Sequence, residues 1–484
     1  MKKFLRILLG LLLVLVLILI IKTITFRSMQ IDVEPVTLPV FGMESVVNLS
    51  KAITYPTISH DIGLPIDTLA FREFHQFLAD AYPLIHLNLK KEVFSEFSLL
   101  YKWEGRNAEL KPVILMAHMD VVPAGETEAW QKPPFSGEND GTFIWGRGTL
   151  DDKGPLIAIL EAVERLIDEG FVPEQTIYLA FGHDEEIYGY KGAMIIANTL
   201  KERGVEAAFV LDEGLVISEG IVPMINIPVA SIGISEKGFL SVSLTVEMEG
   251  GHSSTPEKES AITVLNRALH NLINKQMKAD ITGPTKDFLR FTGPEMPFLP
   301  RIIFANQWLF KGLILKIYEG SNAGNAAVRT TTAPTIINAG IKDNMIPTKA
   351  EAVVNFRIIP GETSEDVLKH IEKVISDDRI KLAIVGYALE PSPVSPINSS
   401  GFEIIHTTIR QVFPETMVNP MLNLGATDSR HFAVVTNNIY RFIPVTFTQE
   451  DLARVHGLDE RIGIEDFKKA IGFYYQLIKN IVHL

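Results

Sequence analysis

The chain has 484 residues, of which 46% are hydrophobic and 21% charged, so it can bury a large core and is neither a disordered chain nor a multispan membrane protein. The 45 Lys and Arg residues against 58 Asp and Glu residues give a net charge of −13, which argues against a nucleic-acid partner. Cysteine is absent, which excludes disulfide bonds, thiolate metal ligands and cysteine nucleophiles.

The first 27 residues differ from the rest of the chain. Three basic residues precede an apolar run over residues 7–21, and Lys22 follows it. The run is shorter than the ~20 residues of a full membrane span, but residues 23–26 can extend it. No small-residue cleavage site follows. We therefore predict an uncleaved signal anchor that associates with a membrane and leaves the body outside the cytosol. The alternatives are a cleaved signal peptide on a secreted protein and a buried core helix.

Apolar runs then alternate with helical segments up to about residue 236. Residues 112–116, 176–181 and 207–211 are predicted to be strands buried on both faces, and residues 155–169 one of the helices between them. Alternation of this kind is typical of a parallel sheet covered by helices. The sequence therefore predicts an α/β fold with a mostly parallel sheet.

Near residue 238 the apolar pattern changes to a period of two. Apolar and polar side chains alternate over residues 239–249 and again over residues 350–358, which predicts two strands with one solvated face each. A helix is predicted from about Ser364, and a further strand over residues 381–385. This order predicts a small α+β sandwich.

These patterns divide the chain into three parts. Residues 1–27 form the anchor or signal segment, residues 28–236 and 393–484 form a catalytic domain, and residues 237–392 form an inserted domain. Within the inserted domain, residues 284–326 are too apolar for a solvated linker. They provide either extra packing or a dimer face, or else a wall for an acyl chain.

Acidic and histidine side chains follow three of the predicted strands. The segments concerned are His118-Met-Asp120, His183-Asp-Glu-Glu186 and Asp212-Glu213. Ligands bind at the carboxyl ends of the strands in an open parallel sheet, so these groups should gather at one edge. Carboxylates gathered there raise one another's pKa unless a cation compensates. We therefore predict a metal site, although each group alone could also be a structural or solvated residue.

A fourth acidic cluster, Asp151-Asp152, ends a glycine-rich turn before a predicted helix. Taken alone, it could be a helix cap whose carboxylate accepts hydrogen bonds from free backbone N–H groups. Because it joins the three clusters that follow strands, we include it in the predicted metal site.

The chain resembles the dizinc aminoacylase, carnosinase and carboxypeptidase S family of metallopeptidases. The resemblance covers most of the chain in family order, and the N-terminal segment lies outside it. It is carried by the following motifs: AHMDVVP at 117–123, WGRGTLDDKG at 145–154, LAFGHDEE at 179–186, LDEG at 211–214, SEKG at 235–238, GHSSTP at 251–256, RTTTAPT at 329–335, NFRIIPGET at 355–363, TDSR at 427–430 and VHGLDERI at 455–462.

The resemblance implies two zinc ions in each subunit. His118 and Asp212 would hold one ion, Glu186 and His456 would hold the other, and Asp151 would bridge both with one oxygen each. Two such ions polarise a carbonyl group and lower the pKa of a shared water molecule.

The same resemblance implies roles for residues around the metal. Glu185 would be the general base that takes a proton from the water shared by the zinc ions. Asp120 would hydrogen-bond His118 and fix its tautomer. His252, in the inserted domain, would stabilise the oxyanion in the active site of a partner subunit, which implies a homodimer. A solvated loop histidine is the alternative for His252.

Three residues are implied to bind substrate. Arg357 would grip the substrate carboxylate, because a guanidinium group can bind a carboxylate with two hydrogen bonds. Asn344 and Arg430 are further candidates for that role. The alternative for Arg357 is a surface arginine on a sheet.

The implied activity is hydrolysis of the amide bond of an N-acyl amino acid or short peptide, and its formation when amine and fatty acid are abundant. A dipeptidase or carboxypeptidase acting on small peptides is one alternative. An inactive membrane-tethered binding protein on a peptidase fold is a second. All the implied ligand positions and the base are occupied by suitable residues, which favours an enzyme.

Overall fold

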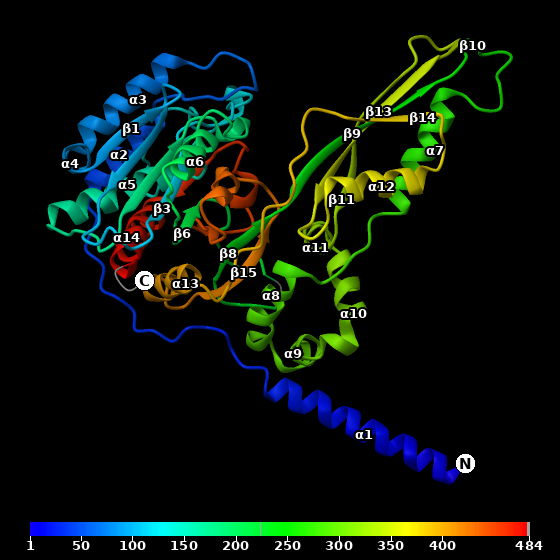
Figure 1. Ribbon diagram of the computed structural model, residues 1–484, viewed down its shortest axis with the longest axis horizontal. Coiled ribbons are helices and arrows are strands. Elements are labelled where there is room, and N and C mark those ends of the chain that lie inside the picture. Colours follow the sequence, from blue (N-terminus) through cyan, green and yellow to red (C-terminus); the bar gives the residue numbers. More distant parts are fainter. Residues whose placement is uncertain (223, 482–484) are drawn as a thin grey trace.

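A ten-stranded sheet forms the centre of the first part of the protein in the computed structural model, which describes residues 1–222 and 224–481 (Figure 1). Residues 482–484, at the end of the predicted catalytic segment, lie outside the described residues. The strand order is β1-β2-β5-β3-β6-β16-β8-β7-β17, and β15 pairs with β8. The strands are β1 (Lys90–Phe94), β2 (Ser98–Trp103), β3 (Val113–His118), β5 (Ile177–Gly182), β6 (Phe209–Asp212), β7 (Ile217–Ser218), β8 (Val229–Glu236), β15 (Met417–Asn423), β16 (Ile439–Arg441) and β17 (Thr446–Phe447).

The central strands of this sheet are parallel and buried on both faces. β3 pairs in parallel with β5 and β6, and β6 pairs in parallel with β16. All six residues of β3 are buried, and so are all six of β5, because both run as continuous apolar segments between two helical layers. The predicted α/β class and mostly parallel sheet are confirmed.

Helices cover both faces of the sheet. Alternate residues of β3 enter different cores: Val113 and Leu115 pack with α5 and α14, while Ile114 and Met116 pack with α6. The helices of this part are α2 (Met43–Ile53), α3 (Thr68–Ala81), α4 (Pro83–Asn88), α5 (Lys153–Asp168), α6 (Ala193–Glu202), α13 (Ser400–Val412) and α14 (Ile464–Asn480).

A second sheet has its own core within residues 237–392. Its strand order is β11-β13-β9-β14, and all neighbours are antiparallel. Helices α7 and α12 cover one face, against which the apolar side chains of β9 and β13 alternate inward as predicted. The elements are β9 (Gly238–Glu247), α7 (Ala261–Asn274), β11 (Thr331–Ala339), β13 (Lys349–Ile358), α12 (Ser364–Ile375) and β14 (Ile380–Ile384).

A small two-stranded sheet extends this second part at its far end. β10 (Gly251–His252) pairs antiparallel with β12 (Met345–Ile346). Figure 1 shows β10 at the tip of the molecule, away from the large sheet. Side chains on this two-stranded sheet therefore do not reach the carboxyl ends of β3 and β6 in the same chain.

The apolar segment 284–326 is helical. It comprises α8 (Gly283–Thr292), α9 (Phe298–Ala305), α10 (Gln307–Glu319) and α11 (Asn322–Val328). α8 packs against β15 of the large sheet, and α9 packs against the N-terminal helix α1 (Lys2–Ile24).

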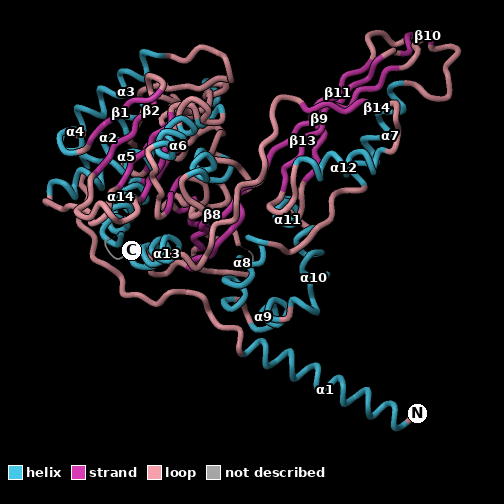
Figure 2. The backbone as a smooth tube through the Cα atoms, viewed as in Figure 1, coloured by secondary structure: helices cyan, strands magenta, loops and turns pink. Residues whose placement is uncertain are grey.

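The N-terminal helix leaves the body as a separate rod. Within the described residues, α1 is the one helix that is long and apolar enough to cross a membrane, with a mean hydropathy of 3.2 over its best window. Figure 2 shows that residues 26–42, which join it to α2, form a long loop over the body without helix or strand.

Candidate metal centre

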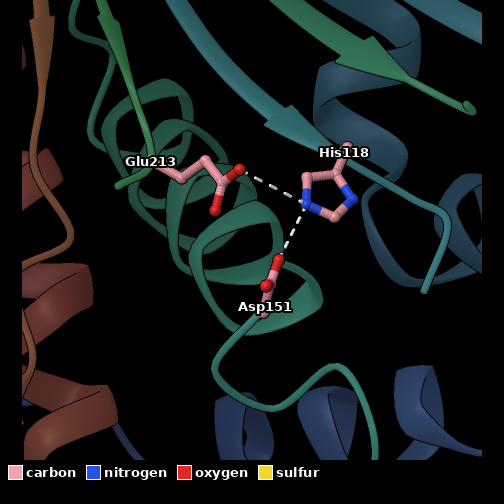
Figure 3. Close-up of side chains that lie close together, drawn as sticks. All are labelled: His118, Asp151 and Glu213. Atoms are coloured by element: carbon pink, nitrogen blue, oxygen red, sulfur yellow. Dashed lines mark hydrogen bonds and ion pairs between the residues drawn. The ribbon is translucent and has the colours of Figure 1, made fainter. Parts of the chain in front are cut away.

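Three side chains from different elements meet at the carboxyl end of β3. His118 is the last residue of β3, Asp151 precedes α5, and Glu213 follows β6 directly. Nε2 of His118 lies 2.9 Å from Oδ1 of Asp151 and 3.6 Å from Oε1 of Glu213 (Figure 3). The three donor atoms lie within 4.8 Å of one another, close enough to share one metal ion.

A second group forms on the other oxygen of the same aspartate. Nε2 of His456 lies 3.0 Å from Oδ2 of Asp151 and 3.3 Å from Oε2 of Glu186. Glu186 belongs to the short helical turn η2 (Glu185–Ile187) after β5, and His456 belongs to the loop before β18 (Arg461–Gly463). Asp151 therefore offers one carboxylate oxygen to each group.

The electrostatics of these groups suit bound cations. Burial and the charge of Asp151 raise the pKa of Glu186 to about 7. Hydrogen bonds that His456 donates to the carboxylates of Asp151 and Glu186 raise the pKa of His456 to about 10. Burial also raises the pKa of Glu213 well above its usual range, with Asp151 adding to the effect. Carboxylates packed this closely can all ionise together only if positive charge lies among them.

Asp120 lies beside His118 and the turn that follows β5. Its Oδ1 lies 3.3 Å from Nδ1 of His118. Its two carboxylate oxygens also accept hydrogen bonds from the backbone N–H groups of Glu185 and Glu186, each at 3.2 Å. One buried carboxylate therefore positions both His118 and the turn that carries Glu185 and Glu186.

A buried ion pair that sequence analysis missed fixes the turn before Asp151. Glu460, which is fully buried, pairs with Arg147 at 2.6 Å. It also accepts hydrogen bonds from the backbone N–H groups of Gly148 and Leu150 at 3.0 and 2.8 Å. The only signal in the sequence is its place in the motif VHGLDERI, four residues after His456. The contact ties the loops of Asp151 and His456 together.

The structure places Glu213, and not its neighbour Asp212, beside His118. Oδ2 of Asp212 accepts a hydrogen bond from the backbone N–H of Ser429 at 2.8 Å, so this carboxylate anchors the loop at 427–430. Successive side chains at a strand end point in opposite directions, which sends Glu213 toward His118. The geometry thus favours Glu213 in the position for which the sequence suggested Asp212.

Glu185 lies in the same site without belonging to either donor group. Burial raises the pKa of this half-buried carboxyl group, the charge of His118 opposes that rise, and the charges of Asp428, Glu186 and Asp151 add to it. His183, in the same sequence motif, is turned into the core, where it forms a hydrogen bond with Ser98 at 2.6 Å, and it belongs to neither donor group. The structure therefore places Glu185 beside the donor groups without making it one of their donors.

The predicted substrate-binding residues fall into two separate places. The guanidinium group of Arg357, on β13, lies 4.9 Å from the ring centre of Phe239. Burial lowers the pKa of Arg357, and the charge of Arg430 also lowers it. Two neighbouring guanidinium groups suit an anionic ligand.

His252 and Asn344 lie together at the other place, the small sheet formed by β10 and β12. The backbone N–H of Ser253 donates a hydrogen bond to the carbonyl oxygen of Asn344 at 3.2 Å. Both His252 and Asn344 are exposed, and β10, which carries His252, lies at the tip of the second part (Figure 1). The structure therefore joins these two residues to each other and not to Arg357.

The fold and the donor set together define a metal-binding α/β protein. The family model of peptidase family M20/M25/M40 matches residues 114–480. The chain is 41% identical over 485 residues to the probable carboxypeptidase S-like 2 of Dictyostelium discoideum, covering 98% of this chain and 92% of that protein. It is 43% identical over 436 residues to the N-fatty-acyl-amino acid synthase/hydrolase PM20D1 of Xenopus tropicalis, covering 89% of this chain and 85% of that protein.

A solved structure agrees on the fold. The M20 family metallo-carboxypeptidase Sso-CP2 from Sulfolobus solfataricus superposes with a TM-score of 0.68 at 20% identity, covering 91% of this chain and all of that one. The chain belongs to the peptidase family M20/M25/M40, which confirms the resemblance read from its motifs. It is a metal-dependent hydrolase of amide bonds.

Proposed function

We propose that the protein is a dizinc amidohydrolase that cleaves, and under suitable supply forms, the amide bond of N-acyl amino acids. The observation that carries this proposal is the position of Asp151, which offers one oxygen to the group of His118 and Glu213 and the other to the group of Glu186 and His456. Imidazole nitrogens and carboxylate oxygens are ligands that zinc prefers.

The residues present fit two cations. Each donor group contains one histidine and two carboxylates counting the shared Asp151, which leaves room on each ion for a substrate or water. When bound, zinc supplies Lewis acidity that polarises the amide carbonyl and makes a water molecule a stronger acid. Asp120 would keep Nε2 of His118 directed at the ion, because Nδ1 of that ring faces its carboxylate.

Glu185 is proposed as the residue that moves the proton. It lies next to the donor Glu186 but outside both donor groups, so it can accept a proton from the attacking water and return it to the leaving nitrogen. Burial and nearby carboxylates raise the pKa of Glu185, which favours its protonated form and so supports the return of the proton.

The substrate carboxylate is proposed to bind at Arg357 and Arg430. Both side chains are half-buried, and the charge of Arg430 lowers the pKa of Arg357, so a bound carboxylate would relieve repulsion between the two cations. The name of the 43% identical relatives, N-fatty-acyl-amino acid synthase/hydrolase, supports an acyl amino acid as the substrate. The name of the 41% identical relative, carboxypeptidase S-like, supports the second candidate, a carboxypeptidase acting on short peptides.

A substrate panel tests this assignment. Long-chain N-acyl amino acids are expected to be hydrolysed faster than dipeptides, with activity lost on chelation and restored by added zinc. The measurement is release of free amino acid from each substrate. Faster cleavage of peptides with a free carboxyl terminus would favour the carboxypeptidase. No chelator-sensitive activity on any substrate would favour an inactive binding protein.

Metal content distinguishes the two neighbouring acidic residues at the end of β6, Asp212 and Glu213. Glu213→Gln is expected to remove about one metal ion per subunit, because Glu213 is the donor next to His118. Asp212→Asn should keep both ions, since its carboxylate bonds to the backbone of Ser429. Metal analysis of the purified variants, with circular dichroism to confirm folding, checks the ranking. Loss of metal in the folded Asp212 variant alone would restore Asp212 as the ligand.

We also propose that the protein is a homodimer in which His252 serves the partner's active site. Two observations support this. His252 and Asn344 lie exposed at a tip far from their own metal centre. The edge strand β11 exposes Ile336 and Ile337, at 52% and 63%, and an exposed apolar edge strand favours pairing with a second copy.

Finally, we propose that α1 anchors the protein in a membrane with the catalytic domain outside the cytosol. The helix is exposed along almost its whole length, which is unfavourable in water and suits a lipid environment. Its basic N-terminal flank supports this orientation. Cleavage of the segment would give a secreted protein instead.

A further inference from the structure

The helices α9 and α10 carry their apolar side chains on the outside. On α10, Ile314 is the buried residue, whereas Leu309, Leu313 and Ile317, which follow one another at a spacing of four, are exposed. Such spacing places them in one stripe along the helix. The exposed apolar residues of the two helices are Phe298, Leu299, Trp308, Leu309, Leu313 and Ile317. Exposed apolar side chains gathered on two neighbouring helices are typical of an interaction surface.

Contacts with α1 fix where this stripe lies. The side-chain amide of Asn306, between α9 and α10, donates to the carbonyl oxygen of Leu19 at 3.2 Å and to Oγ1 of Thr23 at 3.4 Å. Thr23 is the buried residue of α1. Nζ of Lys22 lies 5.4 Å from the ring centre of Trp308. The start of α10 therefore packs beside the last turns of α1, as Figure 1 also shows for α9.

The position along α1 at which α10 makes contact corresponds to the depth of a membrane interface. Leu19 lies five residues before the end of α1 at Ile24, which corresponds to ~7 Å along a helix that rises 1.5 Å per residue. Amphipathic helices rest ~5–10 Å into the boundary between head groups and acyl chains. A tryptophan beside a lysine, as in Trp308 and Lys22, is typical of that boundary.

We propose that α9 and α10 form a second membrane-binding element, whose exposed apolar stripe enters the outer interface of the bilayer beside α1. The inference rests on the proposed anchor. A bilayer is the occupant that the observations favour, because the stripe continues the exposed apolar surface of α1. Lys316, exposed within the stripe, and Lys22 beside it can meet head-group phosphates. The element would hold the catalytic domain at the surface into which acyl substrates partition.

Tryptophan fluorescence of the full chain in vesicles tests this. The chain has four tryptophans, and the other three, Trp103, Trp130 and Trp145, are buried in the first part of the protein. In vesicles of phosphatidylcholine and phosphatidylglycerol, lipids brominated near the head group should quench the emission that Trp308→Phe removes. Lipids brominated near the chain end should quench it less. The Trp308→Phe protein should be insensitive to both.

A charged double variant provides the matched comparison. Leu309→Glu with Leu313→Glu should abolish the quenching of Trp308, while hydrolysis of a water-soluble substrate stays unchanged. The control is Leu87→Glu with Val93→Glu, two exposed apolar residues on α4 and β1 away from α10, and it should leave quenching intact.

Flotation of the same vesicles separates this inference from the anchor. If the full chain floats with the vesicles and Trp308 stays unquenched, the inference fails and the anchor stands. If the chain does not float, the anchor fails and the inference fails with it. Unquenched Trp308 together with loss of self-association in the Leu309 and Leu313 double variant would assign the stripe to a contact between two copies.

Discussion

Glu185→Gln is expected to lower turnover by about 10²- to 10⁴-fold, the usual effect of removing a general acid–base. Glutamine keeps the shape of the side chain and its hydrogen-bonding capacity, but it cannot accept the proton. Glu185 belongs to neither donor group, so the variant should still bind its full complement of metal. Steady-state kinetics and metal analysis of the same preparation check both parts of this prediction.

The adjacent residue supplies the control. Glu186→Gln should lower metal content as well as activity, because Oε2 of Glu186 lies 3.3 Å from Nε2 of His456 in the second donor group. Added zinc should then restore part of the activity of the Glu186 variant and none of that of the Glu185 variant. If Glu185→Gln loses metal while Glu186→Gln keeps it, the roles of the two carboxylates must be exchanged.

The sequence predicted the large sheet well because each central strand is a continuous apolar run. The run predicted over residues 176–181 is observed as β5 (Ile177–Gly182), and residues 112–116 as β3 (Val113–His118). Burial on both faces leaves few polar positions in such strands, so their limits stand out. The inserted strands were equally clear, since β9 and β13 alternate with a period of two.

The gathering of the metal groups followed from one topological rule. Carboxyl ends of parallel strands meet at one edge, which brought His118, Glu186 and the loop after β6 together. The choice between Asp212 and Glu213 did not follow, because both are carboxylates at adjacent positions. Only the direction of each side chain separates them, and that direction depends on the backbone N–H of Ser429 in a distant segment.

Two further features could not be predicted from sequence patterns, because each depends on a partner far away in the chain. Glu460 is buried against Arg147, more than 300 residues earlier in the chain. Neither residue shows a local periodicity that indicates burial. The packing of α1 against α9 likewise involves Asn306, whose hydrogen bonds with Leu19 and Thr23 join segments 287 and 283 residues apart in the chain.

Mixing two inactive variants is expected to restore activity if His252 acts across a dimer. His252→Ala alone should lower kcat by about 10²- to 10³-fold, as removal of one oxyanion donor does, with metal retained. The His252 side chain is exposed on β10 and lies outside both donor groups, so metal binding should not depend on it.

The arithmetic of random exchange sets the size of the recovery. A Glu185→Gln subunit still provides an intact His252, and a His252→Ala subunit still provides an intact Glu185. Mixed dimers therefore contain one site with both groups. Because about half of the dimers are mixed and each has one working site of two, about a quarter of wild-type activity should return.

Asn344 extends this test, because it directly precedes β12, the strand that pairs with the strand of His252. Asn344→Ala mixed with Glu185→Gln should recover activity in the same way, since both tip residues would enter the partner's site together. Asn344→Ala mixed with His252→Ala should not exceed the two single variants, because every site in the mixture then lacks one tip residue. Subunit exchange is verified independently with two differently tagged chains. With exchange verified, absence of recovery would place His252 in its own subunit's site or outside catalysis.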